Sequence, residues 1–157
     1  MRALKPTTFE HQKYSILIID DNPTNLSVIV DYLSHCGFEI MVARHGKMGI
    51  KRAKYALPDL ILLDVKMPQI DGFETCRRLK ADAKTKDIPV IFMTALTSTQ
   101  DKVRGFAVGA VDYVTKPIQH EEVLARITTH LTIRKLQKKL QKANHGLEEA
   151  NTLLEQR

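Results

Sequence analysis

Short apolar runs alternate with amphipathic stretches along most of this chain, and this alternation restricts the possible folds more than any other feature. Five rounds of the pattern occur between Ser15 and about Leu131. A strand followed by a helix, repeated in this way, is typical of a parallel sheet covered by helices. The apolar runs that we interpret as strands are residues 16–19, 39–43, 60–65, 89–93 and 111–114.

The segments between these runs have helical periodicity and end at residues that favour helix limits. We expect helices over residues 24–36, 46–55, 73–81, 101–108 and from 121 onward. Asn22 is suited to cap the first helix, Pro23 to begin it and Gly37 to end it. Right-handed crossovers and five parallel strands most often give the order 2-1-3-4-5. We therefore predict an α/β protein with a doubly wound, five-stranded parallel sheet.

Polar side chains follow four of the predicted strands, at the edge where such sheets bind ligands. Asp20 and Asp21 follow the first strand, and Asp64 lies at the end of the third. Thr94 ends the fourth strand, and Lys116 follows the fifth. Each residue alone has an ordinary structural explanation, such as a cap, a turn or a solvated side chain. Their occurrence together at one edge favours a functional site.

The three carboxylates of this group need positive charge nearby. A close pair of like charges costs on the order of 4 kcal/mol at an effective dielectric constant near 20. Lys116 supplies one charge, and we expect a small hard cation, Mg²⁺, to supply the rest. With that charge masked, the Asp64 carboxylate is suited to attack phosphorus, and Thr94 to hydrogen-bond a phosphoryl oxygen.

These residues resemble a known family, the receiver domains of bacterial two-component response regulators. The resemblance covers roughly residues 14–131 and rests on ILIIDDNPTN, LILLDVKMPQIDGFE, IFMTAL and GAVDYVTKP. It implies a flavodoxin-like fold and a signalling switch that takes a phosphoryl group from a sensor histidine kinase or a histidine phosphotransfer protein. Asp64 would be the phosphoacceptor. Mg²⁺ would be bound directly by Asp21, through water by Asp20, and by the backbone carbonyl of Lys66.

The same resemblance implies roles for residues after the fourth and fifth strands. Lys116 would pair with the phosphoryl group, and the peptide bond between Lys116 and Pro117 would be cis. Thr94 and Tyr113 would be the switch pair, and the fourth helix, fifth strand and fifth helix would form the readout face.

Two positions bear on how long the phosphoryl group would last. Lys66 and Leu96 lie two residues beyond Asp64 and Thr94, where the family tunes hydrolysis of the acyl phosphate. A long cation and a bulky apolar side chain at these places hinder an attacking water, so we predict slow self-dephosphorylation.

Three other functions share part of this pattern: a phosphatase, a nucleotide-binding protein and an interaction module. A haloacid-dehalogenase-like phosphatase also uses a strand-end Asp and Mg²⁺, but it needs a second Asp where this chain has Lys66, so we expect no enzyme acting on outside substrates. A nucleotide-binding fold would carry a glycine-rich loop where residues 20–23 read Asp-Asp-Asn-Pro. The alternative that stays open is a receiver-like interaction or dimerisation module that is never phosphorylated. The intact Asp64 and Lys116 favour the switch.

The last predicted helix continues past the domain to Arg157. Apolar residues recur at alternating steps of three and four from Ile133, at Leu136, Leu140, Ala143, Leu147, Ala150 and Leu154. This spacing predicts a coiled-coil seam, and hence a homodimer. We divide the chain into a tail (1–13), a receiver domain (14–131) and a helical coiled-coil linker (132–157). Such a linker is expected to lead to an output domain that is missing from this chain.

Charge and composition further restrict the partners and the cellular location that we expect. The net charge of +6 is concentrated in two helical segments without a nucleic-acid-binding motif, so we expect solvated helix faces and no direct nucleic-acid partner. An apolar run long enough for a membrane helix and a signal peptide are both absent from the sequence. We therefore expect a cytoplasmic protein with no membrane partner. Cys36 and Cys76 are expected to be reduced and half-buried.

Overall fold

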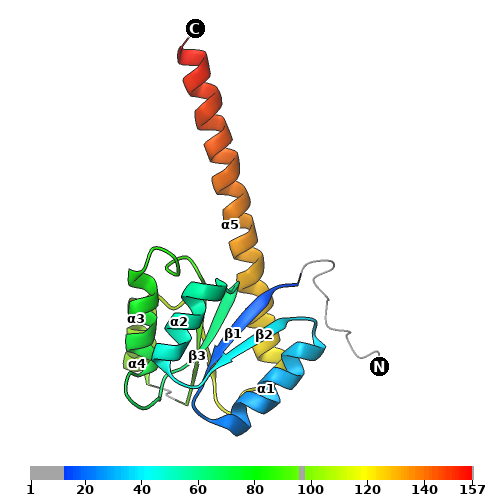
Figure 1. The fold of residues 1–157 in the computed structure, drawn as a ribbon, viewed down its shortest axis with the longest axis vertical. Helices are drawn as coiled ribbons and strands as arrows, with labels where there is room; N and C mark the ends of the chain where they lie inside the picture. Colours follow the sequence, from blue (N-terminus) through cyan, green and yellow to red (C-terminus); the bar gives the residue numbers. More distant parts are fainter. Residues whose placement is uncertain (1–12, 96–97, 157) are drawn as a thin grey trace.

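The computed structural model describes residues 13–95 and 98–156 and contains a five-stranded parallel sheet (Figure 1). The strand order is β2-β1-β3-β4-β5, and every neighbouring pair is parallel, which confirms the predicted fold. The predicted N-terminal tail, apart from Lys13, and the prediction for Leu96 lie outside the described residues. The strands are β1 (Ser15–Ile19), β2 (Glu39–Ala43), β3 (Leu60–Asp64), β4 (Val90–Thr94) and β5 (Asp112–Thr115).

Five helices connect and cover these strands. Their ends differ from the predicted ones by at most two residues, which is the usual uncertainty of a helix end. The helices are α1 (Pro23–His35), α2 (Gly46–Ala56), α3 (Gly72–Ala81), α4 (Thr99–Ala107) and α5 (His120–Glu155). Pro89, predicted to begin the fourth strand, instead precedes it, although its carbonyl still accepts a hydrogen bond from Ile61 N at 2.9 Å.

Two apolar cores lie on opposite faces of the sheet. Ile16 and Ile18 face α1 and α5, whereas Leu17 and Ile19 face α2 and α3. All four side chains are fully buried, because helices cover both faces of the strand that carries them. Continuous apolar runs are the expected consequence of such two-sided burial.

Side-chain caps fix where the helices begin. Asn22 caps α1 as predicted, accepting hydrogen bonds from Thr24 N at 3.0 Å and Asn25 N at 3.2 Å. Gly37 follows α1 with φ +97°, a conformation that glycine adopts without strain. Three further caps were not predicted: His45 for α2, Asp71 for α3 and Ser98 for α4. Cys36 is half-buried as expected, but Cys76 is fully buried, and both are free.

Helix α5 belongs to the domain along its first part and extends beyond it along the second (Figure 1). Val123, Ile127 and Leu131 pack into the core that also contains α1. After Leu131 the helix leaves from the edge where the strands begin, and the guanidinium of Arg134 donates to the carbonyl of Asp87 there. We call residues 132–155 the extension. In the described part of the chain, none of the helices has the length and apolarity that crossing a bilayer requires.

The close approach of Gly72 to the end of β3 generates a test of the fold. A Cβ added at Gly72 would lie 2.3 Å from the backbone oxygen of Asp64 and 2.7 Å from Cα of Val65. Backbone atoms cannot rotate away, so Gly72→Ala is expected to lower the free energy of unfolding by about 1–3 kcal/mol, measured by urea denaturation.

The matched control is Gly146→Ala in the extension, where an added Cβ meets open space. Alanine is the better residue in a helix interior, so this variant is expected to unfold no earlier than the wild type. Equal stability of the Gly72→Ala and wild-type proteins would contradict the contact.

Candidate functional site

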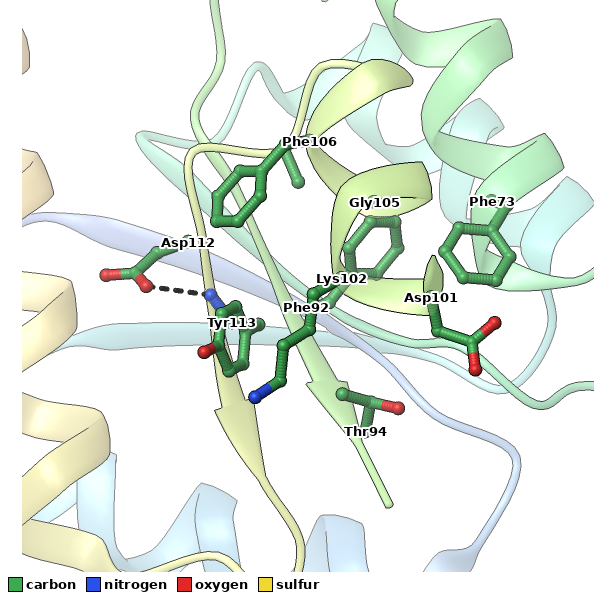
Figure 2. Close-up of a pocket in the computed structure, with 10 residues that line it drawn as sticks. Phe73, Phe92, Thr94, Asp101, Lys102, Gly105, Phe106, Asp112 and Tyr113 are labelled. Carbon is green, nitrogen blue, oxygen red and sulfur yellow. Dashed lines mark hydrogen bonds between the residues drawn. The ribbon is translucent and has the colours of Figure 1, made fainter. Parts of the chain in front are cut away.

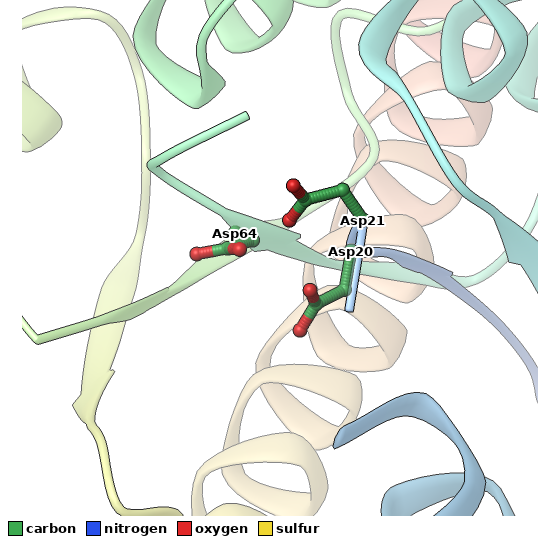
Figure 3. A group of neighbouring side chains, drawn as sticks. All are labelled: Asp20, Asp21 and Asp64. Carbon is green, nitrogen blue, oxygen red and sulfur yellow. The ribbon is translucent and has the colours of Figure 1, made fainter. Parts of the chain in front are cut away.

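Strand pairing brings two acidic residues together at the carboxyl edge of the sheet (Figure 3). Ile19 of β1 is in register with Leu63 of β3, so the residues that follow, Asp20 and Asp64, are neighbours. Asp20 is fully buried and Asp64 is 5% exposed, whereas Asp21 is half-buried. One carboxylate oxygen from each of these three aspartates lies within 4.8 Å of the other two.

Lys116 is the positive charge inside this group. Its Nζ lies 3.1 Å from Oδ1 of Asp64 and 3.6 Å from Oδ2 of Asp20. Its backbone N–H donates to the carbonyl of Thr94 at 2.8 Å, which ties the lysine to the end of β4. The peptide bond from Lys116 to Pro117 is cis, as the resemblance implied.

The buried position of Asp64 makes its charged form unfavourable. Loss of solvation, followed by the nearby Asp20 carboxylate, raises the pKa of Asp64 to about 6, although Lys116 acts in the opposite direction. One lysine therefore does not balance the local negative charge. A further cation would favour the ionised carboxylate.

The described residues fit a small divalent cation at this position. Oδ1 of Asp20 accepts a hydrogen bond from Asn22 N at 2.9 Å, but Oδ2 is buried without a hydrogen-bond partner among the described residues. A buried carboxylate oxygen in that state is suited to a metal-bound water or a metal. The donors are oxygens only, which is the set that Mg²⁺ prefers.

An open hollow of about 530 Å³ lies beside the acidic group. Asp21 and Lys66 line it from the ends of β1 and β3, and Asp101 and Arg104 line it from α4. The hollow is wide enough for a phosphoryl donor to approach the edge of the sheet. Lys66 is exposed in the loop after β3, on the side from which the Asp21 carboxylate is accessible.

Thr94 and Tyr113 lie on the border of a second, much smaller cavity beneath α4 (Figure 2). This cavity measures about 20 Å³, and four of the ten residues that line it are aromatic, among them Phe92 and Phe106. The ring of Phe106 meets that of Tyr113 edge-on, with centroids 6.0 Å apart, and Nζ of Lys102 lies 4.8 Å from the Tyr113 ring centroid. In Figure 2 the Tyr113 hydroxyl points away from Thr94.

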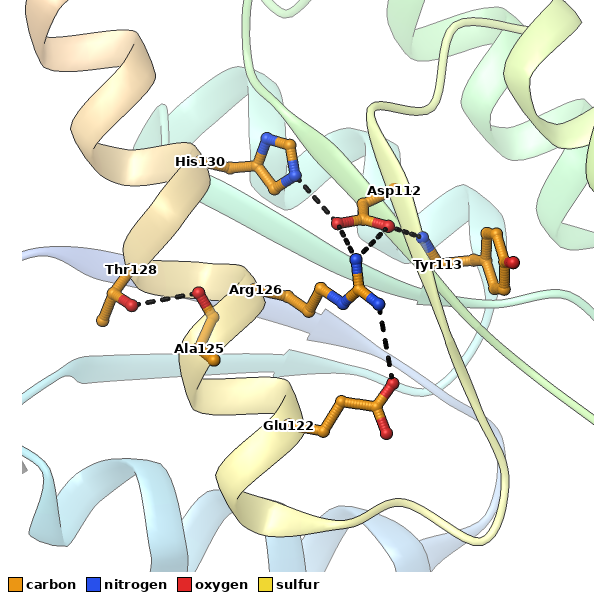
Figure 4. A network of polar contacts seen from close by, with 7 residues as sticks. All are labelled: Asp112, Tyr113, Glu122, Ala125, Arg126, Thr128 and His130. Carbon is orange, nitrogen blue, oxygen red and sulfur yellow. Dashed lines mark hydrogen bonds and ion pairs between the residues drawn. The ribbon is translucent and has the colours of Figure 1, made fainter.

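A polar network next to Tyr113 joins β5 to α5 (Figure 4). The Asp112 carboxylate accepts from Arg126 Nη1 at 3.1 Å and from its neighbour Tyr113 N at 2.9 Å, and it lies 3.0 Å from His130 Nε2. Asp112 and its partners were not predicted as functional residues from the sequence. The sequence gives little indication of this network, because the partners lie 14 and 18 residues from Asp112. They reach the carboxylate only because of the side of α5 that faces β5.

The geometry thus defines a class of protein: an α/β domain with an acidic, lysine-paired centre at the switch point of its sheet. Comparison with known proteins identifies the family. The model of the response regulator receiver domain matches residues 16–128. The chain therefore belongs to the family of response regulator receiver domains.

Relatives and a solved structure agree with this assignment. The chain is 46% identical over 112 residues to the DNA-binding dual master transcriptional regulator RpaA of Synechocystis, a match that covers 71% of this chain and 46% of that protein. It is 40% identical over 116 residues to protein PilH of Pseudomonas aeruginosa, covering 74% of this chain and 96% of PilH. The chain thus spans less than half of RpaA and nearly all of PilH.

The crystal structure of the receiver domain of sensor histidine kinase PA1611 from Pseudomonas aeruginosa superimposes with a TM-score of 0.72 and 26% identity. The alignment covers 77% of this chain and 99% of that one. That structure has a magnesium ion coordinated in its active site cleft.

Charge crowding at the site generates a test that needs no phosphoryl donor. Asp64→Asn keeps the size of the side chain and removes one of three neighbouring carboxylates, leaving Lys116 to Asp20. We expect the variant to be more stable than the wild type by about 1–2 kcal/mol at neutral pH in a chelator, measured by urea denaturation.

The matched control is Asp31→Asn on the exposed side of α1, which should change stability by less than about 0.5 kcal/mol. A less stable Asp64→Asn protein under these conditions would show that the carboxylates are not in conflict.

Proposed function

We propose that this chain is a phosphorylation-dependent signalling switch whose phosphoacceptor is Asp64. The observation that carries the proposal is the buried Asp64 carboxylate with Lys116 Nζ 3.1 Å from one of its oxygens and Asp20 and Asp21 beside it. The donor would be a phosphohistidine of a sensor histidine kinase or a histidine phosphotransfer protein. Family membership supports this class of donor.

The chemistry follows from the groups around Asp64. A carboxylate oxygen of Asp64 attacks phosphorus, a new O–P bond forms, and the P–N bond of the donor breaks, leaving its electron pair on the histidine nitrogen. Lys116 stays close enough to the carboxylate to pair with the incoming phosphoryl oxygens. The Thr94 hydroxyl, at the end of the neighbouring strand, is the group that we assign to donate a hydrogen bond to one of those oxygens.

Mg²⁺ is the cofactor that we propose for this site. The carboxylates of Asp20, Asp21 and Asp64 with the backbone carbonyl of Lys66 would hold it, and it would supply positive charge against the phosphoryl oxygens. The buried Oδ2 of Asp20, which lacks a hydrogen-bond partner among the described residues, supports this assignment, as does the magnesium ion in the related PA1611 receiver structure. We propose no reaction for this chain other than its own phosphorylation and dephosphorylation.

We further propose that Thr94 and Tyr113 connect the site to the face formed by α4, β5 and α5. The cavity of about 20 Å³ between them has room for one water molecule and not for a phenol ring. A Tyr113 ring that turned inward would therefore have to displace residues of α4 that line the cavity, such as Lys102, and with them the helix itself. The readout of phosphorylation is thus expected at α4.

We also propose the domain division and a role for the extension. Residues 14–131 would form the receiver unit, and residues 132–157 would form a helical linker that pairs with a second copy of this chain. The four leucines of the predicted seam are exposed in the single chain, which supports pairing. The extension would thus join two receivers into a homodimer.

Incubation with acetyl phosphate and Mg²⁺ tests the central proposal. The intact mass of the wild type is expected to rise by one phosphoryl group, and a chelator should abolish the increase. Asp64→Asn should show no increase, because it lacks the attacking carboxylate. Asp59→Asn, at the opposite end of β3, is the matched control and should behave as the wild type. An unchanged wild-type mass would favour the unphosphorylated interaction module.

A second experiment tests the connection between Thr94 and the readout face. Thr94→Ala is expected to accept the phosphoryl group but to lose most of the change in amide hydrogen exchange over α4 and β5, a coupling of about 1–3 kcal/mol. Thr94→Ser keeps the hydroxyl and should retain the change. A full response in phosphorylated Thr94→Ala would remove this residue from the switch.

A further inference from the structure

The extension presents an apolar seam along one side of an otherwise polar helix. Leu136, Leu140, Leu147 and Leu154 are 59%, 62%, 63% and 65% exposed. They recur at helical spacing on a helix whose contacts with the domain end near its root, at Leu131 and Arg134. A continuous exposed apolar surface of this kind marks a contact site for another chain.

We propose that the extension pairs with the extension of a second copy in antiparallel orientation. The acidic distal half of one helix then lies along the basic proximal half of the other. This inference rests on the proposed pairing of the extension and adds to it the direction of the two helices, which the spacing of the seam residues does not determine.

The distribution of charge along the extension favours this direction. The proximal half carries five cations, Arg134, Lys135, Lys138, Lys139 and Lys142, whereas the distal half carries three acids, Glu148, Glu149 and Glu155. Parallel helices would place cations beside cations and acids beside acids. Antiparallel helices place each acidic half beside a basic half, and like charges in contact are unfavourable.

The sizes of the seam residues favour the same direction. In the middle of the seam, leucine and alanine alternate as Leu140, Ala143, Leu147 and Ala150. Parallel pairing gives alternating layers of two leucines and two alanines, which demand different distances between the helix axes. Antiparallel pairing places Leu147 against Ala143 of the second copy and Leu140 against its Ala150. Every central layer then contains one large and one small side chain, so one spacing packs them all.

This alignment assigns specific ionic neighbours. Glu149 falls on the side of the seam that faces Lys139 and Lys142 of the second copy, whereas Glu148 falls on the other side, opposite Gln141 and Asn144 of that copy. In the single chain the Glu149 carboxylate lies 2.9 Å from His145 Nε2, and 66% of the Glu149 side chain is exposed.

The root of the extension offers a place for the distal end of the second helix. Arg134, Lys135, Lys138 and Lys139 line an open hollow of about 280 Å³ that also borders Tyr14 and Asp59. The alignment brings Glu155 of the second copy to the level of Lys135, on the side of the seam that carries Arg134. The cluster of cations at the start of one extension thus lies beside the acidic residues near the end of the other.

Disulfide cross-linking tests the direction. The variants Leu136→Cys and Leu154→Cys are each made with Cys36→Ser, so that the introduced cysteine is the exposed one, while the fully buried Cys76 is kept. Antiparallel pairing brings residue 136 of one copy to residue 154 of the other. Two copies of the same residue then lie about 27 Å apart along the axis, too far for a disulfide. We expect an oxidised dimer from the mixture of the two variants and from neither variant alone.

A cross-linked dimer from either variant alone would overturn the antiparallel arrangement and leave the proposed pairing intact. A wild-type protein that sediments as a monomer at all concentrations would overturn both. Neither result would bear on phosphorylation of Asp64, which the mass measurement tests separately.

Charge reversal provides a second test that leaves the seam unchanged. Glu149→Lys places a third positive charge near Lys139 and Lys142 of the second copy, so we expect a dimer dissociation constant roughly three- to tenfold higher at low salt. Adding Lys142→Glu should restore most of the affinity. Glu148→Lys makes the same charge change one residue away and should have little effect. Equal effects of the Glu148→Lys and Glu149→Lys changes would contradict the arrangement.

Discussion

The confinement of the Asp20 and Asp64 carboxylates with one lysine at the carboxyl edge of the sheet is the constraint on which the rest of the structure depends. Register between β1 and β3 makes the two aspartates neighbours, and their burial prevents water from screening the repulsion. Lys116 is held beside them by its backbone hydrogen bond to Thr94. The apolar strands that pack on both faces hold these charges in a geometry that solvated side chains would not adopt.

Much of this arrangement could be predicted because it follows from strand order. Once five apolar runs define a doubly wound sheet, Asp20, Asp64 and Thr94 must end on one edge, and the structure brings them there. Contacts that depend on helix rotation could not be predicted in this way. The ionic contacts of Asp112 with α5 are one example, and the approach of Gly72 to the Asp64 backbone is another. The cap formed by His45 was missed because histidine is not among the favoured capping residues.

Helix α5 combines two environments in one continuous element. Its first turns are fixed to the sheet by Val123, Ile127 and Leu131, and their rotation is fixed by the bonds from Arg126 and His130 to Asp112. Because Asp112 also accepts a hydrogen bond from Tyr113 N, the residue proposed as part of the switch is adjacent to the anchor of the helix. A displacement of β5 at Tyr113 would therefore alter the contacts that orient α5.

The extension leaves the domain at the edge opposite the acidic centre (Figure 1). Its 24 residues, 132–155, span about 36 Å at 1.5 Å per residue. A straight helix of this length would act as a lever arm that pivots near Leu131, where it leaves the domain. A tilt of only about 5° at the fulcrum would move the distal end by about 3 Å, close to the length of a hydrogen bond. Under the proposed switch, small rearrangements inside the receiver would thereby become larger displacements at the distal end of the helix.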